Sequence, residues 1–126
     1  MKILIADDEA LMRMLIAQTL EDLEERGVEL LTAVNGEEAL QMVRAENPQL
    51  VFLDVMMPKM NGFEVCEAIK GAAPTAGTHV VLLTAKGQDA DHQRGKRAGA
   101  DVYMTKPFDP DELVNLAETV LGLPHG

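Results

Sequence analysis

Five short apolar runs, separated by longer stretches in which apolar residues recur at helical spacing, constrain the fold of this chain most. Each run is followed by a polar turn, and the runs cover residues 3–6, 30–34, 50–53, 80–83 and 102–104. The stretches between them repeat apolar residues every three or four positions, which is typical of amphipathic helices. Five strands that alternate with five helices predict an α/β fold, in which helices cover both faces of a parallel sheet through right-handed crossovers.

The predicted helices carry signals for where they begin and end. Three of them have an Asn or Asp three residues before a Glu, the spacing of an N-cap and capping box: Asn35, Asn61 and Asp109. Four residues are expected to end the first, second, third and fifth helices: Gly27, Asn47, Gly71 and Gly122. The fourth helix, near 87–97, contains Gly95 and few large apolar residues, so we expect it to be the least firmly anchored.

The hydrophobic core is predicted to be aliphatic, because 47% of the residues are hydrophobic and only 3% are aromatic. Apolar residues at helical spacing in the first helix are Leu11 with Leu15, and Met12 with Ile16 and Leu20. Three methionines are interpreted as core or boundary residues: Met12, Met14 and Met42. A chain of 126 residues suffices for one domain. We assign it to 1–122 and expect 123–126 to be either a natural tail or the start of a linker.

Charge and cysteine content limit the surroundings in which this chain can work. A formal net charge of −10 repels the phosphate backbone, so we expect no direct binding to nucleic acid or to an anionic membrane. No apolar run is long enough to span a membrane or to serve as a signal peptide. The single cysteine, Cys66, cannot form an internal disulfide and is interpreted as a buried apolar residue. A reducing cytoplasm is therefore the expected location.

Charged or hydroxyl side chains follow four of the five predicted strands. Asp7 and Asp8 follow the first, and the others are Asp54, Thr84 and Lys106. Ligands of open parallel sheets bind outside the carboxyl ends of the strands, near the point where strand order reverses. In the flavodoxin-like order 2-1-3-4-5, these four strands are adjacent and the second lies at the edge. We therefore expect the five side chains to meet at one rim of the sheet.

The chemistry of these residues indicates a phosphoryl site that uses a divalent cation. Three carboxylates held close together repel one another, and a shared cation relieves that repulsion. Ligands that are all oxygens favour Mg2+ or Mn2+ over zinc. Lys106 and Thr84 supply a positive charge and a hydroxyl donor for a bound dianion. Phosphoryl transfer requires mainly positioning and charge neutralisation, which makes Asp54 the best candidate for the nucleophile.

Six motifs in this order resemble the response-regulator receiver domain of two-component signalling. They are LIADDE at 4–9, VFLDVMMP at 51–58, MNG at 60–62, LLTA at 82–85, GAD at 99–101 and KPF at 106–108. The resemblance extends from Met1 to about Leu121, which is nearly the whole chain.

The resemblance implies that Asp54 accepts a phosphoryl group from a phosphohistidine of a sensor histidine kinase or phosphotransfer protein, in a transfer catalysed largely by the receiver itself. It implies a Mg2+ site formed by Asp8, Asp54 and the backbone carbonyl of Met56, with Asp7 acting mostly through water. It also implies that Thr84 and Lys106 hold the phosphoryl oxygens. The bond between Lys106 and Pro107 is expected to be cis.

The resemblance further implies how phosphorylation is transmitted. The Thr84 hydroxyl moves inward and the ring of Tyr103 follows it, which alters the surface of the fourth helix, fifth strand and fifth helix. The expected partners are a downstream effector or an output domain, and a homodimer formed on phosphorylation is also compatible. Met56 and Lys86 are interpreted by their position as residues that tune the lifetime of the phosphorylated form.

Two other functions are compatible with parts of the sequence. A phosphatase of the haloacid-dehalogenase type also uses an aspartate at a strand end, but it needs a second Asp where this chain has Met56, and it needs a cap insertion. A pseudo-receiver has the same fold but works without phosphorylation, and the complete set of site residues argues against it. We therefore predict a signalling switch, which is not an enzyme acting on external substrates.

Overall fold

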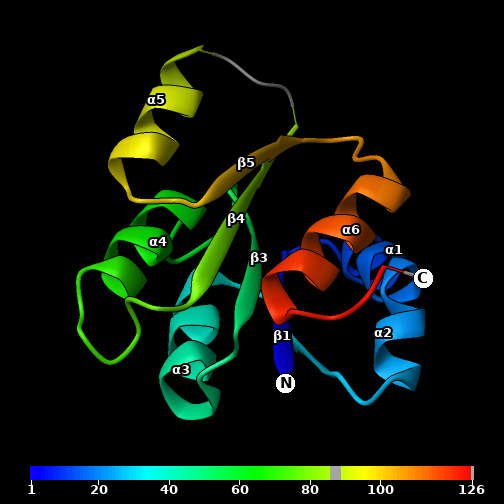
Figure 1. The fold of residues 1–126 in the computed structure, drawn as a ribbon. Coiled ribbons are helices and arrows are strands. Elements are labelled where there is room, and N and C mark those ends of the chain that lie inside the picture. The colour runs from blue at the N-terminus through cyan, green and yellow to red at the C-terminus, as the bar shows by residue number, and fades with distance from the viewer. Residues whose placement is uncertain (86–88, 126) are drawn as a thin grey trace.

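The computed structural model describes residues 1–85 and 89–125, with the backbone alone at 89–92. Within these residues, a five-stranded parallel sheet lies between two layers of helices (Figure 1). The strands are β1 (Lys2–Ala6), β2 (Glu29–Ala33), β3 (Leu50–Asp54), β4 (His79–Thr84) and β5 (Val102–Thr105). The helices are α1 (Ala10–Thr19), α2 (Glu21–Glu25), α3 (Gly36–Glu46), α4 (Gly62–Lys70), α5 (Asp89–Arg97) and α6 (Pro110–Leu121). The order β2-β1-β3-β4-β5 confirms the predicted topology.

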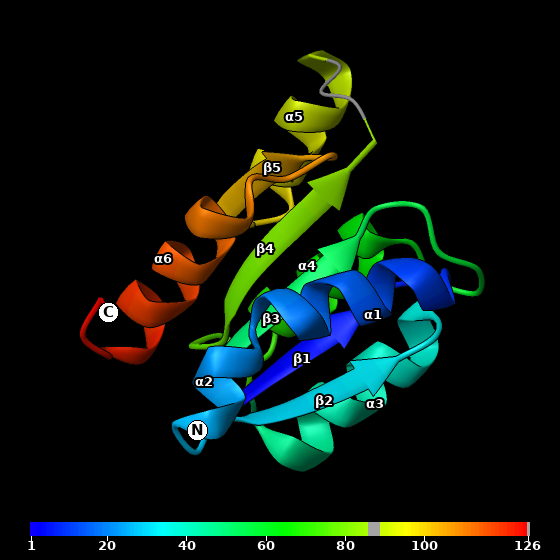
Figure 2. The same cartoon turned by 90° about the vertical axis from the view of Figure 1, so that its right-hand side faces the viewer.

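The sheet has a separate apolar core on each face, because successive side chains of a strand point in opposite directions. In β1, Leu4 belongs to the core that α3 and α4 cover. Ile5 belongs to the core covered by α1, α2 and α6. Figure 2 shows α1, α2 and α6 in front of the sheet and α3 and α4 behind it. All five residues of β3 are buried, which explains why the central strands read as unbroken apolar runs.

The predicted helix ends are largely confirmed. The side chains of Asn35 and Asn61 each accept a hydrogen bond from the backbone of the Glu three residues later, and Asn61 forms the complete capping box. Asp109 caps α6 through the backbone N–H of Asp111 instead. Asn47 and Gly122 end α3 and α6 in the left-handed conformation. These local contacts satisfy backbone groups that a helix end leaves unpaired.

The first predicted helix is wrong in two respects. It is interrupted at Leu20, so the described residues contain six helices instead of five. Leu20 is buried, and the turn there lets the following helix bury Leu23 in the same core. Leu11, Met14 and Leu15 are exposed, because at 100° per residue they lie roughly 100–160° around α1 from the buried Ile16. Met12 and Met42 do lie at the boundary of the core, as predicted.

The helix layer that contains α3 and α4 includes the single cysteine. Cys66 of α4 is fully buried, as predicted, and its Sγ donates a hydrogen bond to the carbonyl oxygen of Ala98 at 3.4 Å. In α5 the first described helical residue is Asp89, and of residues 93–98 only Gly95 and Ala98 are buried. That this helix is the least firmly anchored stays a prediction. None of the helices in the described part of the chain is both long and apolar enough to cross a membrane.

Candidate functional site

The register of the strands brings the predicted site residues to one rim. Ala6 of β1 pairs with Leu53 of β3, so Asp7 and Asp54 both come immediately after that pair. Thr84 of β4 pairs with Thr105 of β5, which immediately precedes Lys106. The arrowheads of β1, β2 and β4 in Figure 2 point toward this rim of the sheet. Parallel strands end at the same side, and this common ending gathers residues that are distant in sequence.

Three carboxylates form the centre of the site. Asp7, Asp8 and Asp54 each place a carboxylate oxygen within 4.8 Å of the others. Asp7 is fully buried and Asp54 is 5% exposed, whereas Asp8 is open to solvent. The cluster therefore has a buried floor and one solvent-facing ligand at its mouth.

The ammonium group of Lys106 lies against two of these carboxylates. Its Nζ is 3.0 Å from Oδ2 of Asp7 and 3.2 Å from Oδ1 of Asp54. Burial acts to lower the pKa of Lys106, but the hydrogen bond to Asp7 and the charges of Asp54 and Asp7 outweigh it and raise the pKa above its ordinary value. The lysine is thus held in its charged form beside the candidate nucleophile.

Asp54 is less acidic than an ordinary aspartate. Burial, followed by the neighbouring charge of Asp7, raises the pKa of Asp54 to about 6, although Lys106 acts in the opposite direction. The N–H of Met56 also donates to Oδ1 of Asp54 at 3.4 Å. Three carboxylates against one ammonium leave two negative charges in excess, and all the donors are oxygens. This donor set fits a hard divalent cation such as Mg2+.

Backbone contacts fix the position of Asp7. Its Oδ1 accepts a hydrogen bond from the N–H of Glu9 at 2.9 Å. The guanidinium of Arg13 donates to the backbone carbonyl of Asp7 at 2.7 Å. Arg13 was not predicted to belong to the site. The only signal in the sequence is its place in the helix that follows the Asp pair, where a long cationic side chain can reach back to the strand end.

The loop after β3 approaches the site closely because Gly62 has no side chain. Its N–H donates to the carbonyl of Val55 at 2.9 Å. A Cβ atom at Gly62 would lie 2.6 Å from the backbone oxygen of Asp54, which is too close for any side chain. The capping box of Asn61 begins α4 at this point. The glycine thus lets α4 start directly against the strand end that carries Asp54.

A cleft of about 490 Å³ adjoins the acidic cluster. It is lined by Asp8, Met56, Met57, Pro58 and Asn61. The side chain of Met56 is 76% exposed, whereas Met57 beside it is buried. Met56 therefore stands at the mouth of the site, where the sequence placed it. Lys86, the other residue expected there, lies outside the described residues.

The two predicted switch residues occupy the neighbouring strands. Thr84 is buried at the end of β4, and its carbonyl accepts a hydrogen bond from the N–H of Lys106 at 2.5 Å. Tyr103 of β5 pairs with Leu82, two residues before Thr84. Its half-buried ring packs against the core that α3 and α4 cover. The bond between Lys106 and Pro107 is cis, as the resemblance implies.

Comparison with known proteins identifies one family. The model of the response regulator receiver domain matches residues 3–118. The chain is 43% identical over 120 residues to the probable transcriptional regulator ycf27 of Pyropia yezoensis, covering 95% of this chain and 47% of that protein. It is 40% identical to the alkaline phosphatase synthesis transcriptional regulatory protein PhoP of Bacillus subtilis, covering 95% and 48%. The chain spans about half the length of these relatives.

Solved structures agree in fold. The beryllofluoride-activated receiver domain of DrrB superposes with a TM-score of 0.84 at 35% identity, covering 96% of this chain and 97% of that one. The chemotaxis protein CheY4 of Vibrio cholerae gives a TM-score of 0.83 at 33% identity, covering 94% and 97%. The family consists of signalling domains, and the chain belongs to it: this is a response regulator receiver domain.

Proposed function

We propose that this domain is a phosphorylation-dependent switch in which Asp54 accepts a phosphoryl group in a Mg2+-dependent reaction. The donor is a phosphohistidine of a sensor histidine kinase or histidine phosphotransfer protein. One observation carries the proposal: the Asp54 carboxylate clusters with those of Asp7 and Asp8, and the ammonium of Lys106 contacts both Asp54 and Asp7. The switch occupies residues 1–122, followed by the tail 123–126, and works in the cytoplasm.

Each site residue has a separate part in the proposed transfer. A carboxylate oxygen of Asp54 bonds to phosphorus as the bond between phosphorus and the histidine nitrogen breaks, and the imidazole leaves with the bonding electrons. Lys106 neutralises a phosphoryl oxygen and the Thr84 hydroxyl donates a hydrogen bond to another. Bound by Asp7, Asp8, Asp54 and the carbonyl of Met56, Mg2+ or Mn2+ supplies the remaining positive charge.

The nucleophile must be ionised to react, and the site contains opposing influences on its charge. Burial and Asp7 favour the protonated form of Asp54, whereas Lys106 favours the carboxylate. A divalent cation at the three carboxylates acts in the same direction as Lys106. The site is therefore reactive when both cations are in place.

The proposed output runs through Thr84 and Tyr103 to the surface formed by α5, β5 and α6. A downstream effector or an output domain reads that surface, and phosphorylation can also drive homodimer formation through it. Relatives named as transcriptional regulators, in which the matched region is about half of the protein, support an output domain in a longer chain. No direct contact of this domain with nucleic acid or membrane is proposed.

Phosphorylation by a small donor tests the proposal directly. The protein is incubated with acetyl phosphate and Mg2+, and its intact mass is measured. We expect the mass of one phosphoryl group to be gained by the wild type and by Asp101→Asn, which alters a carboxylate away from the rim. Asp54→Ala, or chelation of the metal, should abolish the gain. An unchanged wild-type mass would favour the pseudo-receiver, and sustained hydrolysis of a small phosphate ester would favour the phosphatase.

A further inference from the structure

A glycine in the interior of α5 contacts the predicted switch tyrosine. Gly95 is buried, and a Cβ atom there would lie 2.9 Å from Cδ2 and 3.1 Å from Cε2 of Tyr103. The same atom would lie 3.1 Å from Cδ1 of Leu82. Real Cβ atoms almost never approach other atoms to 2.9 Å, so a side chain at this position requires the ring to move. Tyr103 thus packs directly on the helix backbone.

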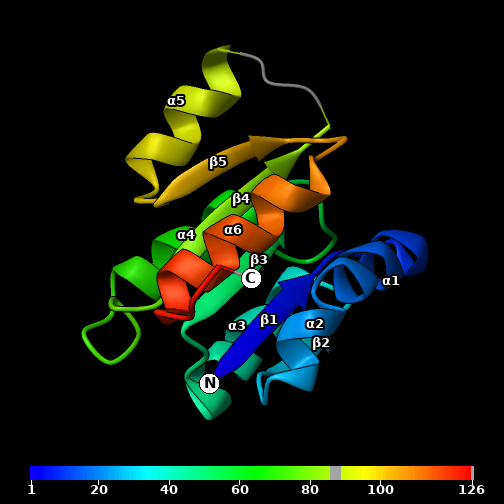
Figure 3. The same ribbon diagram turned by 45° about the vertical axis from the view of Figure 1, so that its right-hand side comes forward.

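Glycine is otherwise a poor choice at this position. In a helix interior it is less favourable than alanine, because the unfolded chain loses more conformational freedom there. The residues on either side, Arg94 and Lys96, are exposed, so α5 reaches the interior here through Gly95. In both Figure 1 and Figure 3 the C-terminal end of α5 lies beside the start of β5. The ring of Tyr103 fills the space that a side chain at position 95 would occupy.

The ring has room to leave this position without unfolding the domain. A cleft of about 290 Å³ lies beside it, lined by Gly95 and Tyr103 together with Asp101 and their neighbours. The ring is only half-buried, at the edge strand of the sheet. A methyl group at position 95 can therefore displace the ring toward the cleft while β5 stays paired with β4.

We propose that Gly95 is a positioning residue of the switch, which by lacking a side chain fixes the Tyr103 ring against α5 and couples the movements of ring and helix. The contact itself does not depend on phosphorylation. Its part in signalling rests on the function proposed above, in which the ring moves when Asp54 is phosphorylated.

A double-mutant cycle tests the contact. At an open helix position Gly→Ala lowers the unfolding equilibrium constant by about fivefold. We expect Gly95→Ala to raise that constant when Tyr103 is present and to lower it in Tyr103→Ala, where the ring is gone. If Tyr103→Ala does not fold, Tyr103→Val keeps the strand preference and still removes the ring. Gly77→Ala, with no atom within 4 Å of its added Cβ, should behave alike in both backgrounds.

The position of the ring can be followed without a label, because Tyr103 is the only tyrosine and the chain has no tryptophan. Tyrosine fluorescence is recorded before and after addition of beryllofluoride, a phosphoryl mimic, with Mg2+. We expect Gly95→Ala to alter the emission of the resting protein and to lose at least about half of the response, whereas Gly77→Ala matches the wild type. A merely destabilising substitution would leave the response of the folded protein intact.

The outcomes separate this inference from the proposed function. If Gly95→Ala is stabilising to the same extent with and without the ring, or if its emission and response equal those of the wild type, the role of Gly95 is refuted. If the reversal of sign is found but wild-type fluorescence does not respond to beryllofluoride, the contact stands and the proposed transmission through Tyr103 fails, whereas phosphorylation of Asp54 is judged by the mass gain.

Discussion

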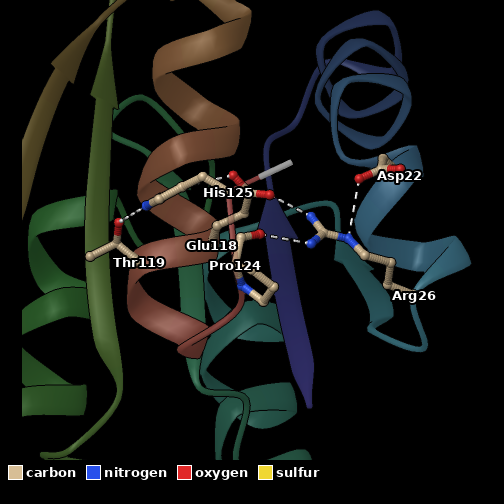
Figure 4. A network of polar contacts seen from close by, with 6 residues as sticks. All are labelled: Asp22, Arg26, Glu118, Thr119, Pro124 and His125. Carbon is tan, nitrogen blue, oxygen red and sulfur yellow. Dashed lines mark hydrogen bonds and ion pairs between the residues drawn. The ribbon is translucent and has the colours of Figure 1, made fainter.

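Arg26, the residue that follows α2, and Glu118 of α6 form an ion pair of 2.5 Å between residues that are 92 positions apart in the sequence (Figure 4). Glu118 is 2% exposed. Its other oxygen lies 3.0 Å from Nδ1 of His125, and Arg26 also donates to the carbonyl of Pro124 at 3.0 Å. The residues that follow α6 are thereby bound back onto α2.

Loss of Arg26 should destabilise the fold. Arg26→Ala leaves the buried carboxylate of Glu118 without its permanently charged partner, and an uncompensated buried charge is unfavourable. Urea unfolding should show a lower midpoint, together with greater proteolytic sensitivity after residue 122. Lys2→Ala is the control, because it removes an ion pair to Glu46 that is open to solvent. Equal effects of the two substitutions would contradict the importance of the buried network.

The same network predicts a dependence of stability on pH. Hydrogen bonds from His125 and Arg26 hold the pKa of Glu118 below its ordinary value of 4.5. A carboxyl group with a lowered pKa contributes stability above its unfolded pKa, and that contribution is lost as the pH falls through the folded pKa. Glu118→Gln should therefore flatten the decline of stability below about pH 4.5, measured by urea unfolding. A decline identical to that of the wild type would exclude this contribution.

Asp54→Asn should stabilise the metal-free protein. A carboxyl group whose folded pKa is raised from 3.8 to about 6 opposes folding most strongly above pH 6, and this cost fades as the pH falls from 6 to 3.8. After allowance for solvent screening we expect a gain of about 1 kcal/mol at neutral pH, or roughly 4 °C in Tm. Mg2+ should raise the Tm of the wild type and have little effect on the variant.

The matched control, Asp101→Asn, should change stability in the opposite direction. Burial acts to raise the pKa of Asp101, but its hydrogen bonds with Lys70 and the N–H of Val80 outweigh it and lower the pKa. Asp101→Asn should therefore reduce the Tm under the same conditions. A loss of stability in Asp54→Asn would contradict the strained acidic cluster.

Removal of the ammonium group should slow phosphorylation more than it alters folding. Lys106→Met deletes the charge that faces Asp7 and Asp54, and loss of one such stabilising group slows a reaction by about a hundredfold. The rate of mass gain with acetyl phosphate gives the measurement. Lys70→Met is the control, because its ammonium group pairs with Asp101 away from the rim. A near-normal rate in Lys106→Met would remove this residue from the proposed chemistry.

Met56 should control how long the phosphoryl group persists. Its exposed side chain borders the cleft at the acidic cluster, where we expect it to limit the approach of water. Once the phosphodonor is removed, the phosphorylated Met56→Ala variant should lose its phosphoryl group by hydrolysis several times faster than the wild type, as followed by intact mass. Met14→Ala truncates an exposed methionine on α1 and should keep the wild-type rate. Unchanged hydrolysis in Met56→Ala would reject the tuning role.

The sequence predicted the sheet and its rim because both follow from short-range patterns. The order of strands and helices fixes a parallel sheet, and parallel strands end on one side, so Asp7, Asp54 and Lys106 had to meet there. The spacing of residues along the chain does not, however, give the distances between their side chains. That Lys106 contacts both acids, and that Asp8 alone is exposed, depends on side-chain packing.

Other features required contacts between distant elements. The interruption at Leu20 depends on how α1 and α2 share one core, which apolar spacing alone does not reveal. In the sequence, Gly95 indicates only a weakly anchored α5, because nothing local shows that the Tyr103 ring fills the space beside it. Likewise, Arg26 and Glu118 look like two ordinary surface charges in the sequence, and only the fold shows that they pair.

The reactivity of Cys66 can be used to measure transient opening of this domain. It is the only thiol in the chain, it lies beneath the segment that follows α5, and burial raises its pKa to about 11. Alkylating reagents react with exposed thiolates, so Cys66 reacts only when the segment that covers it moves away. The rate of that reaction, with and without a phosphoryl mimic, measures how often Cys66 becomes exposed in the folded protein.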